Sequence, residues 1–124
     1  MSNPGLIKTH IAAGVIGKFR IVAQGASDGE VKQGTATTDA LLGVTEGFAY
    51  VAGDRPSIVR SGIADVEYGG VVTRGAPLTS DASGRAIVAT PAVGVNARTI
   101  GFAEVSGVLG DIGSLLVCPN QIQG

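Results

Sequence analysis

Short runs of alternating apolar and polar residues, separated by turn residues, make up most of the chain. In Ala64, Asp65, Val66, Glu67 and Tyr68, for example, apolar and acidic side chains alternate, as on a strand with one face buried. No apolar stripe at helical spacing continues for two turns. The pattern therefore predicts nine strands. They lie at residues 18–24, 30–33, 41–46, 57–61, 63–68, 77–80, 85–89, 99–106 and 114–118.

Two of these runs do not alternate. Residues 100–103 and 115–118 are apolar at nearly every position, which is typical of a strand covered on both faces. We expect the core to cover one face and a neighbouring subunit to cover the other. Cys118, in the second run, is then a buried and unreactive small hydrophobe.

The strand pattern repeats at an offset of about 58 residues. The preserved order favours a duplication over chance similarity in a chain with 20 glycines among 124 residues. We predict an all-β fold: a small glycine-rich barrel or sandwich of two repeated four-strand units, about 17–61 and 75–118, in one β domain, 17–124. The matches are 42–46 with 100–104, 57–59 with 114–116, Gly53-Asp54 with Gly110-Asp111, and Gly17 with Gly75.

Residues 1–16 precede the first clear strand and form a candidate extended N-terminal arm. Pro4 and Gly5 interrupt regular structure, while Leu6 and Ile7 are apolar enough to dock on another surface. We expect residues 1–10 to be mobile in the free protein and ordered against a partner or a neighbouring subunit. A frayed end with an edge strand is the alternative. The expected contact residues are Pro4, Leu6, Ile7, Lys8 and His10.

Composition excludes much chemistry. Nine basic residues against ten acidic ones give a net charge of -1, without the basic excess of a nucleic-acid binder. One cysteine and one histidine are too few for a zinc site. Asp65 and Glu67 fit a solvated strand face, with Arg60 or Arg74 as counter-charge, better than an acid–base pair. We expect no catalytic residue, no cofactor and no metal site, although a loose calcium site in the turns stays open.

The sequence also shows neither a signal peptide nor a membrane span. Residues 1–5 have neither the basic region nor the apolar region of a signal peptide, and no apolar run approaches the length of a membrane span. We therefore expect no membrane partner. The chain is predicted to be a structural or interaction protein rather than an enzyme.

One stretch of sequence carries a resemblance. Residues 62–70, 72–81 and 84–86, together with 100–104 and Gly110-Asp111, resemble the capsid cement (decoration) proteins of tailed bacteriophages and prophages. Pro77 departs from that pattern at one turn. The resemblance implies a β-rich protein made in the bacterial host cytoplasm. It would bind the major capsid protein at the outer surface of the assembled capsid and stabilise the shell.

The resemblance also implies self-association, because members often form trimers at local three-fold positions. We therefore expect a homo-oligomer, with a trimer favoured and a dimer possible. The alternative function is a non-catalytic β-barrel interaction or carrier module of a cellular complex. A carrier needs a lysine at a hairpin tip, and Lys32 is the nearest candidate, although Val31 and Gln33 do not form the expected flanks.

Overall fold

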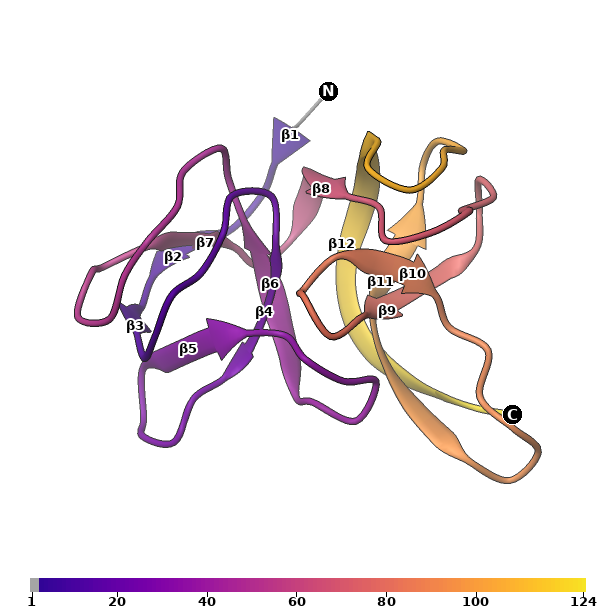
Figure 1. Ribbon diagram of the computed structural model, residues 1–124, viewed down its shortest axis with the longest axis horizontal. Helices are drawn as coiled ribbons and strands as arrows, with labels where there is room; N and C mark the ends of the chain where they lie inside the picture. Colours follow the sequence, from indigo (N-terminus) through magenta and orange to yellow (C-terminus); the bar gives the residue numbers. More distant parts are fainter. Residues whose placement is uncertain (1–2) are drawn as a thin grey trace.

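The computed structural model describes residues 3–124, which form two six-stranded β-sheets (Figure 1). The predicted all-β fold is therefore confirmed. The described residues include no helix long and apolar enough to cross a membrane. Each of the nine predicted strands overlaps one observed strand, from β4 to β12.

The two sheets divide the chain approximately in half. The first sheet has the order β2 (Ile7–Thr9), β7 (Ser57–Val59), β6 (Leu41–Thr45), β4 (Ile21–Gln24), β5 (Glu30–Gln33) and β3 (Ile11–Ala12). The second has the order β1 (Asn3–Pro4), β8 (Gly62–Glu67), β12 (Ile112–Gln123), β11 (Asn96–Ala103), β9 (Pro77–Ser80) and β10 (Ala86–Val88). Neighbouring strands are antiparallel, apart from the parallel pair β3 and β5.

The strand order repeats between the two sheets. Both sheets contain a series of five neighbouring strands, β2-β7-β6-β4-β5 in the first and β8-β12-β11-β9-β10 in the second. In each series the strand that is first in the chain pairs with the last, and the fourth, second and third strands follow. β2 and β8 thus add an equivalent fifth strand to the four predicted for each unit. Outside the strands, Ile16 and Tyr50 exchange two backbone hydrogen bonds, as Val72 and Gly107 do. These shared pairings support a duplication of the chain.

The repeated glycines have a physical reason in close backbone contact. A Cβ atom on Gly43 would collide with the carbonyl oxygen of Val59, and one on Gly101 would collide with that of Leu116. Only glycine allows the strands to approach so closely at these positions. The predicted match of Gly17 with Gly75 was wrong, because the turn residue equivalent to Gly75 is Phe19 (φ of 55° against 89°).

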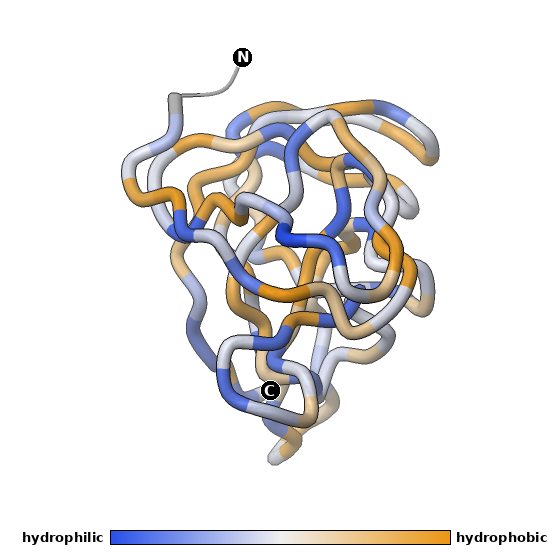
Figure 2. Tube along the Cα trace, turned by 90° about the vertical axis from the view of Figure 1, so that its left-hand side faces the viewer, coloured by the Kyte–Doolittle hydropathy of each residue, from blue (hydrophilic) through white to orange (hydrophobic). Residues whose placement is uncertain are grey.

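The core has two parts. The larger cluster lies between the sheets and includes Ile21 and Ala23 of β4, whereas Val22 faces a smaller cluster within the first sheet. β4 is therefore covered on both faces, and every residue of β6 is buried as well. Viewed from the side of the first sheet, hydrophobic and hydrophilic positions follow one another in short stretches along the trace (Figure 2).

Within this one chain, the core covers only one face of the apolar strands of the second half, and coverage of the other face by a neighbouring subunit stays a prediction. On β12, Leu115 and Val117 are buried, but the side chain of Leu116 is 40% exposed and Cys118 is exposed. The expectation that Cys118 is buried was therefore wrong. The outer face of β12 is not covered by the described part of the chain, so its apolar run alternates between core and surface.

The N-terminal segment is extended, but it is not a free arm. β1 pairs with β8 of the second sheet, and β2 then pairs with β7 of the first (Figure 1). Between them, the Gly5 N–H donates to the Ser61 carbonyl, and the Leu6 N–H donates to the Ser61 hydroxyl. From residue 3 onward, two edge strands satisfy the segment's backbone polar groups within the same chain, which favours the alternative of an edge strand over a mobile arm. Residues 1 and 2 of the predicted arm lie outside the described residues.

Candidate interaction surfaces

The predicted contact residues divide into exposed and internal positions. Leu6, Ile7 and Lys8 are exposed, so they remain accessible to a partner. Pro4 is half-buried in β1, where it suits an edge strand because it lacks an N–H to donate. His10 was expected among the contact residues, but it is only 7% exposed and is an internal residue of this chain.

His10 is held against an arginine. Its Nε2 atom lies 3.2 Å from Nη1 of Arg60, so Nε2 accepts the guanidinium proton and the ring proton lies on Nδ1. Nδ1 is buried near the Gly29 backbone, but it makes no well-formed hydrogen bond with the described residues. Burial, followed by the charge of Arg60, lowers the pKa of His10 below its usual 6.5. The ring is therefore neutral at neutral pH.

A row of apolar side chains crosses the outer face of the second sheet. Pro77 of β9 is opposite Phe102 of β11, which is opposite Leu116 of β12, which is opposite Ile63 of β8. Phe102 and Leu116 are each 40% exposed, and Pro77 and Ile63 are half-buried. We call these four residues the outer row. Sequence reasoning missed the outer row, although strict alternation would have placed Phe102 and Leu116 outward.

Exposed apolar residues also recur in equivalent loops. Val15 and Val71 each precede a bridge residue and are 74% and 75% exposed. Val51 and Val108 each accept a backbone N–H bond in a turn capped by an aspartate, Asp54 or Asp111, and are likewise exposed. The repeat therefore presents the same kind of apolar loop twice, which is a property expected of a contact surface.

The carboxylates that sequence analysis singled out have structural partners. Glu67 forms an ion pair with Arg20 at 3.0 Å and lies 3.9 Å from Arg85, so the counter-charges of this glutamate are not the predicted Arg60 or Arg74. The Asp65 carboxylate accepts a hydrogen bond from the Ser114 hydroxyl. Within residues 3–124, no three His, Cys, Asp or Glu side chains gather where they could hold a metal ion.

The carrier alternative receives no support from the position of Lys32. This residue lies within β5, opposite Ala23 of β4, and its ammonium group is 3.7 Å from the Asp39 carboxylate. It is not at the tip of the β4–β5 hairpin, where a carrier lysine would be required.

The fold has a known counterpart. It is similar to the crystal structure of the N base of head fiber gp8.5 in bacteriophage phi29, with a TM-score of 0.66 and 18% sequence identity. The match covers 91% of this chain and 93% of that chain. No protein-family model and no curated protein sequence matches the chain. The likeness establishes the fold, and the resemblance to capsid cement proteins stays a prediction.

Proposed function

We propose that the chain is a structural protein of a phage particle and that it binds the outer surface of the head. The main support is the likeness to a head fiber base, which extends over nearly the whole of both chains. The resemblance of residues 62–70, 72–81, 84–86 and 100–104 and of Gly110-Asp111 to capsid cement proteins agrees with this proposal and is independent of the structural likeness. The partner would be the major capsid protein, and the location would be the outside of the virion.

The exposed apolar residues suit this role. Valine side chains on short loops lose little conformational entropy when they are buried, so they are efficient contacts for a rigid surface. Because the loops at Val15 and Val71 are equivalent, one molecule can present similar contacts to two places on a repeating lattice. Engaging two places at once increases the effective affinity without any new kind of contact.

Binding of this kind would stabilise the shell. A ligand that binds only the assembled shell stabilises it by about 2.7 kcal/mol per site when its free concentration is a hundredfold above the Kd. The proposed mechanism needs no catalytic group. It does need many copies and a surface that exists only after assembly.

Self-association of the chain is the second part of the proposal. The outer row is an apolar stripe across four strands, and burying it between copies gains about 25 cal/mol per Å² of apolar area. A trimer is favoured by analogy with the cement proteins. The row provides a surface for such contacts that is separate from the exposed loops.

The proposal is tested with mature heads of the encoding phage and the purified full chain. We expect the chain to sediment with heads at a fixed ratio, and to raise the temperature at which heads lose their DNA. Failure to sediment with heads, under conditions where the chain is folded, would contradict a head-surface role.

The phi29 neighbour favours a second candidate, the base of a head fiber. A fiber base would sediment with heads but leave their thermal stability unchanged, because it occupies few sites. The melting experiment therefore separates a cement protein from a fiber base, while sedimentation tests the role that the two have in common.

A further inference from the structure

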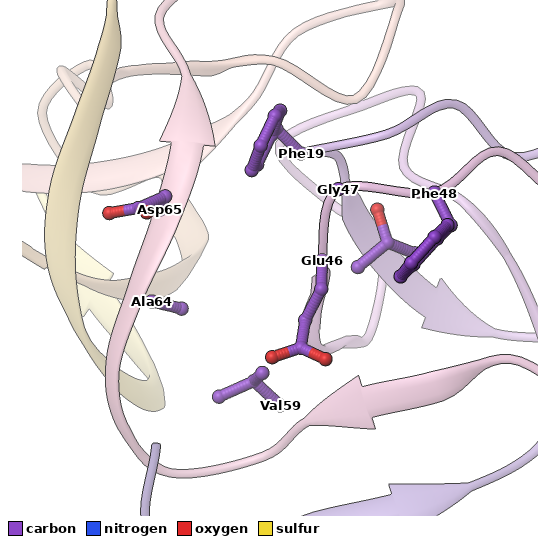
Figure 3. A pocket seen from close by; sticks show the side chains of 8 residues that line it. Phe19, Glu46, Gly47, Phe48, Val59, Ala64 and Asp65 are labelled. Carbon is purple, nitrogen blue, oxygen red and sulfur yellow. The ribbon is translucent and has the colours of Figure 1, made fainter. Parts of the chain in front are cut away.

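A cavity of about 290 Å³ lies where the loop after β6 faces β8. In Figure 3, the ring of Phe19 lies at one end, and the carboxylate of Glu46 lies above Val59 at the other. The methyl group of Ala64 points in from β8, and Phe48 stands beside the loop. The cavity therefore combines apolar walls, the aromatic ring of Phe19 and a carboxylate, with Phe48 at its rim.

Phe19 reaches the cavity through an unusual backbone conformation. Its φ of 55° is in the left-handed region, and it is the only non-glycine residue among those described with a positive φ. The equivalent residue in the second half is Gly75, which adopts this conformation without a steric cost. The phenylalanine ring packs against Gly47, where an added Cβ atom would lie 3.4 Å from the ring. Strain of this kind is concentrated at functional sites.

Glu46 is the charged group of the cavity that has no partner. No hydrogen bond or ion pair joins its carboxylate to another residue in the described part of the chain. The neighbouring Asp65 differs, because its carboxylate points away from the cavity toward β12 and accepts from Ser114. Among the described residues, none that lines the cavity is basic, so the lining does not compensate the charge of Glu46.

The second half provides an internal comparison. Glu104 follows β11 as Glu46 follows β6, and it is exposed. The loop from Glu104 to Gly110 contains no aromatic residue, and Gly75 replaces Phe19. The combination of aromatic rings and carboxylate is therefore specific to the first half, whereas the glutamate alone is common to both halves.

We propose that this cavity binds the guanidinium group of an arginine side chain supplied by a partner protein. Aromatic faces attract cations, and a carboxylate can accept two parallel hydrogen bonds from a guanidinium. Arginine fits better than lysine because its planar group stacks on rings and is less strongly hydrated. The inference rests on the proposed function only for the source of the arginine, which would be the head surface.

The chemistry is tested without any phage component. The full-length, ¹⁵N-labelled protein is titrated with N-acetyl-arginine methylamide, and with the citrulline analogue as a neutral control of the same shape. We expect saturable shifts at the Gly47 and Ala64 amides, with a Kd on the order of millimolar for arginine and no saturation for citrulline. Equal binding of the two compounds, or no shift at these amides, would overturn the proposal.

Matched variants test whether the Glu46 carboxylate and the Phe19 ring contribute to arginine binding. Glu46→Gln should weaken arginine binding about fivefold or more, while Glu104→Gln should leave it unchanged. Phe19→Gly, which suits the left-handed backbone, should keep the fold and weaken binding. Similar losses in Glu46→Gln and Glu104→Gln would show a non-specific charge effect and overturn the proposal.

Sedimentation with phage heads then tests whether the head supplies the arginine. If the head supplies the arginine, Glu46→Gln should reduce co-sedimentation and Glu104→Gln should not. If the wild-type chain binds N-acetyl-arginine methylamide but not heads, the proposed function fails and the guanidinium site stands. If both variants bind heads like the wild type, the head is excluded as the source.

Discussion

The ring of Tyr68 occupies the space that Gly107 leaves open. A Cβ atom on Gly107 would lie 2.7 Å from Cδ2 of Tyr68, well inside contact distance. In the first half, the equivalent positions hold Ala12 and Tyr50, so the large residue has changed places with the small one. The two halves therefore fill a similar volume with the large and the small residue exchanged, and cores tolerate substitutions that keep the total volume.

This exchange predicts the effect of a single methyl group. Gly107→Ala should lower the free energy of unfolding by about 1–3 kcal/mol, because the fully buried Tyr68 ring has little room to move away. Urea denaturation measures the change. Gly70→Ala is the matched control, since nothing lies within 4 Å of a Cβ there, and it should change stability by less than about 0.5 kcal/mol. Equal stability of the two variants would show that the contact is not tight.

The N-terminal strands should contribute to stability in the free chain. Removing residues 1–9 deletes β1 and β2 and breaks the backbone bonds to Arg60 and Ser61. At about 1 kcal/mol for each of these bonds, we expect a loss of roughly 2–4 kcal/mol, seen as a lower Tm by circular dichroism.

Lys8→Ser is a control within the same segment. Its side chain is exposed, so the substitution should change the free energy of unfolding by less than about 0.5 kcal/mol. A truncated chain that melts at the wild-type temperature would show that the segment is a frayed end after all.

Local patterning located β4 to β12, because turn residues separate them, although it ended β12 at residue 118 and the strand continues to Gln123. It predicted residues 3–10 poorly, since Pro4 and Gly5 indicate a break in regular structure. A two-residue edge strand nevertheless tolerates a proline, whose missing N–H is not needed on the open side. The pairing that orders this segment involves β7 and β8, some 50 residues away, and such distant contacts leave no local signal.

The interaction surfaces were harder to predict for a similar reason. The outer row depends on the register of β9, β11, β12 and β8, which alternation within one strand cannot supply. The cavity depends on Phe19 and Glu46, which are far apart in the sequence but are joined by a backbone hydrogen bond from Phe19 N–H to the Glu46 carbonyl. The left-handed backbone of Phe19 could be suspected from sequence only by aligning it with Gly75, and the apparent match with Gly17 concealed that alignment.

Stability should fall in mild acid because of His10. Its folded pKa lies below 6.5, so between the two values the unfolded chain binds more protons than the folded one. The free energy of unfolding should therefore decrease as pH falls through about 6.5, by at most about 1.4 kcal/mol per pH unit. The charges facing the ring, Arg60 and Lys8, are both positive and strengthen this effect.

Urea denaturation between pH 7.5 and pH 5 measures this slope. His10 is the only histidine in the chain, so His10→Gln should flatten the slope in this window, whatever its effect on stability at pH 7.5. Asp39, whose pKa is lowered, acts in the same direction, but only below its usual 3.8. A slope unchanged in His10→Gln would assign the pH dependence to another group.

The outer row predicts how self-association can be broken without unfolding the chain. Leu116→Lys places a charge in the centre of the row, opposite both Phe102 and Ile63. Because the Leu116 side chain is already 40% exposed, the fold should lose less than about 1 kcal/mol, whereas a charge buried between subunits without a partner is strongly destabilising. Light scattering should show an oligomer, most readily a trimer, for the wild type and a monomer for Leu116→Lys. Val93→Lys, at a residue that is 95% exposed and outside the row, is the matched control and should keep the wild-type mass. If Leu116→Lys also keeps that mass, the subunits meet elsewhere, and the apolar loops at Val15 and Val71 become the surface to substitute next.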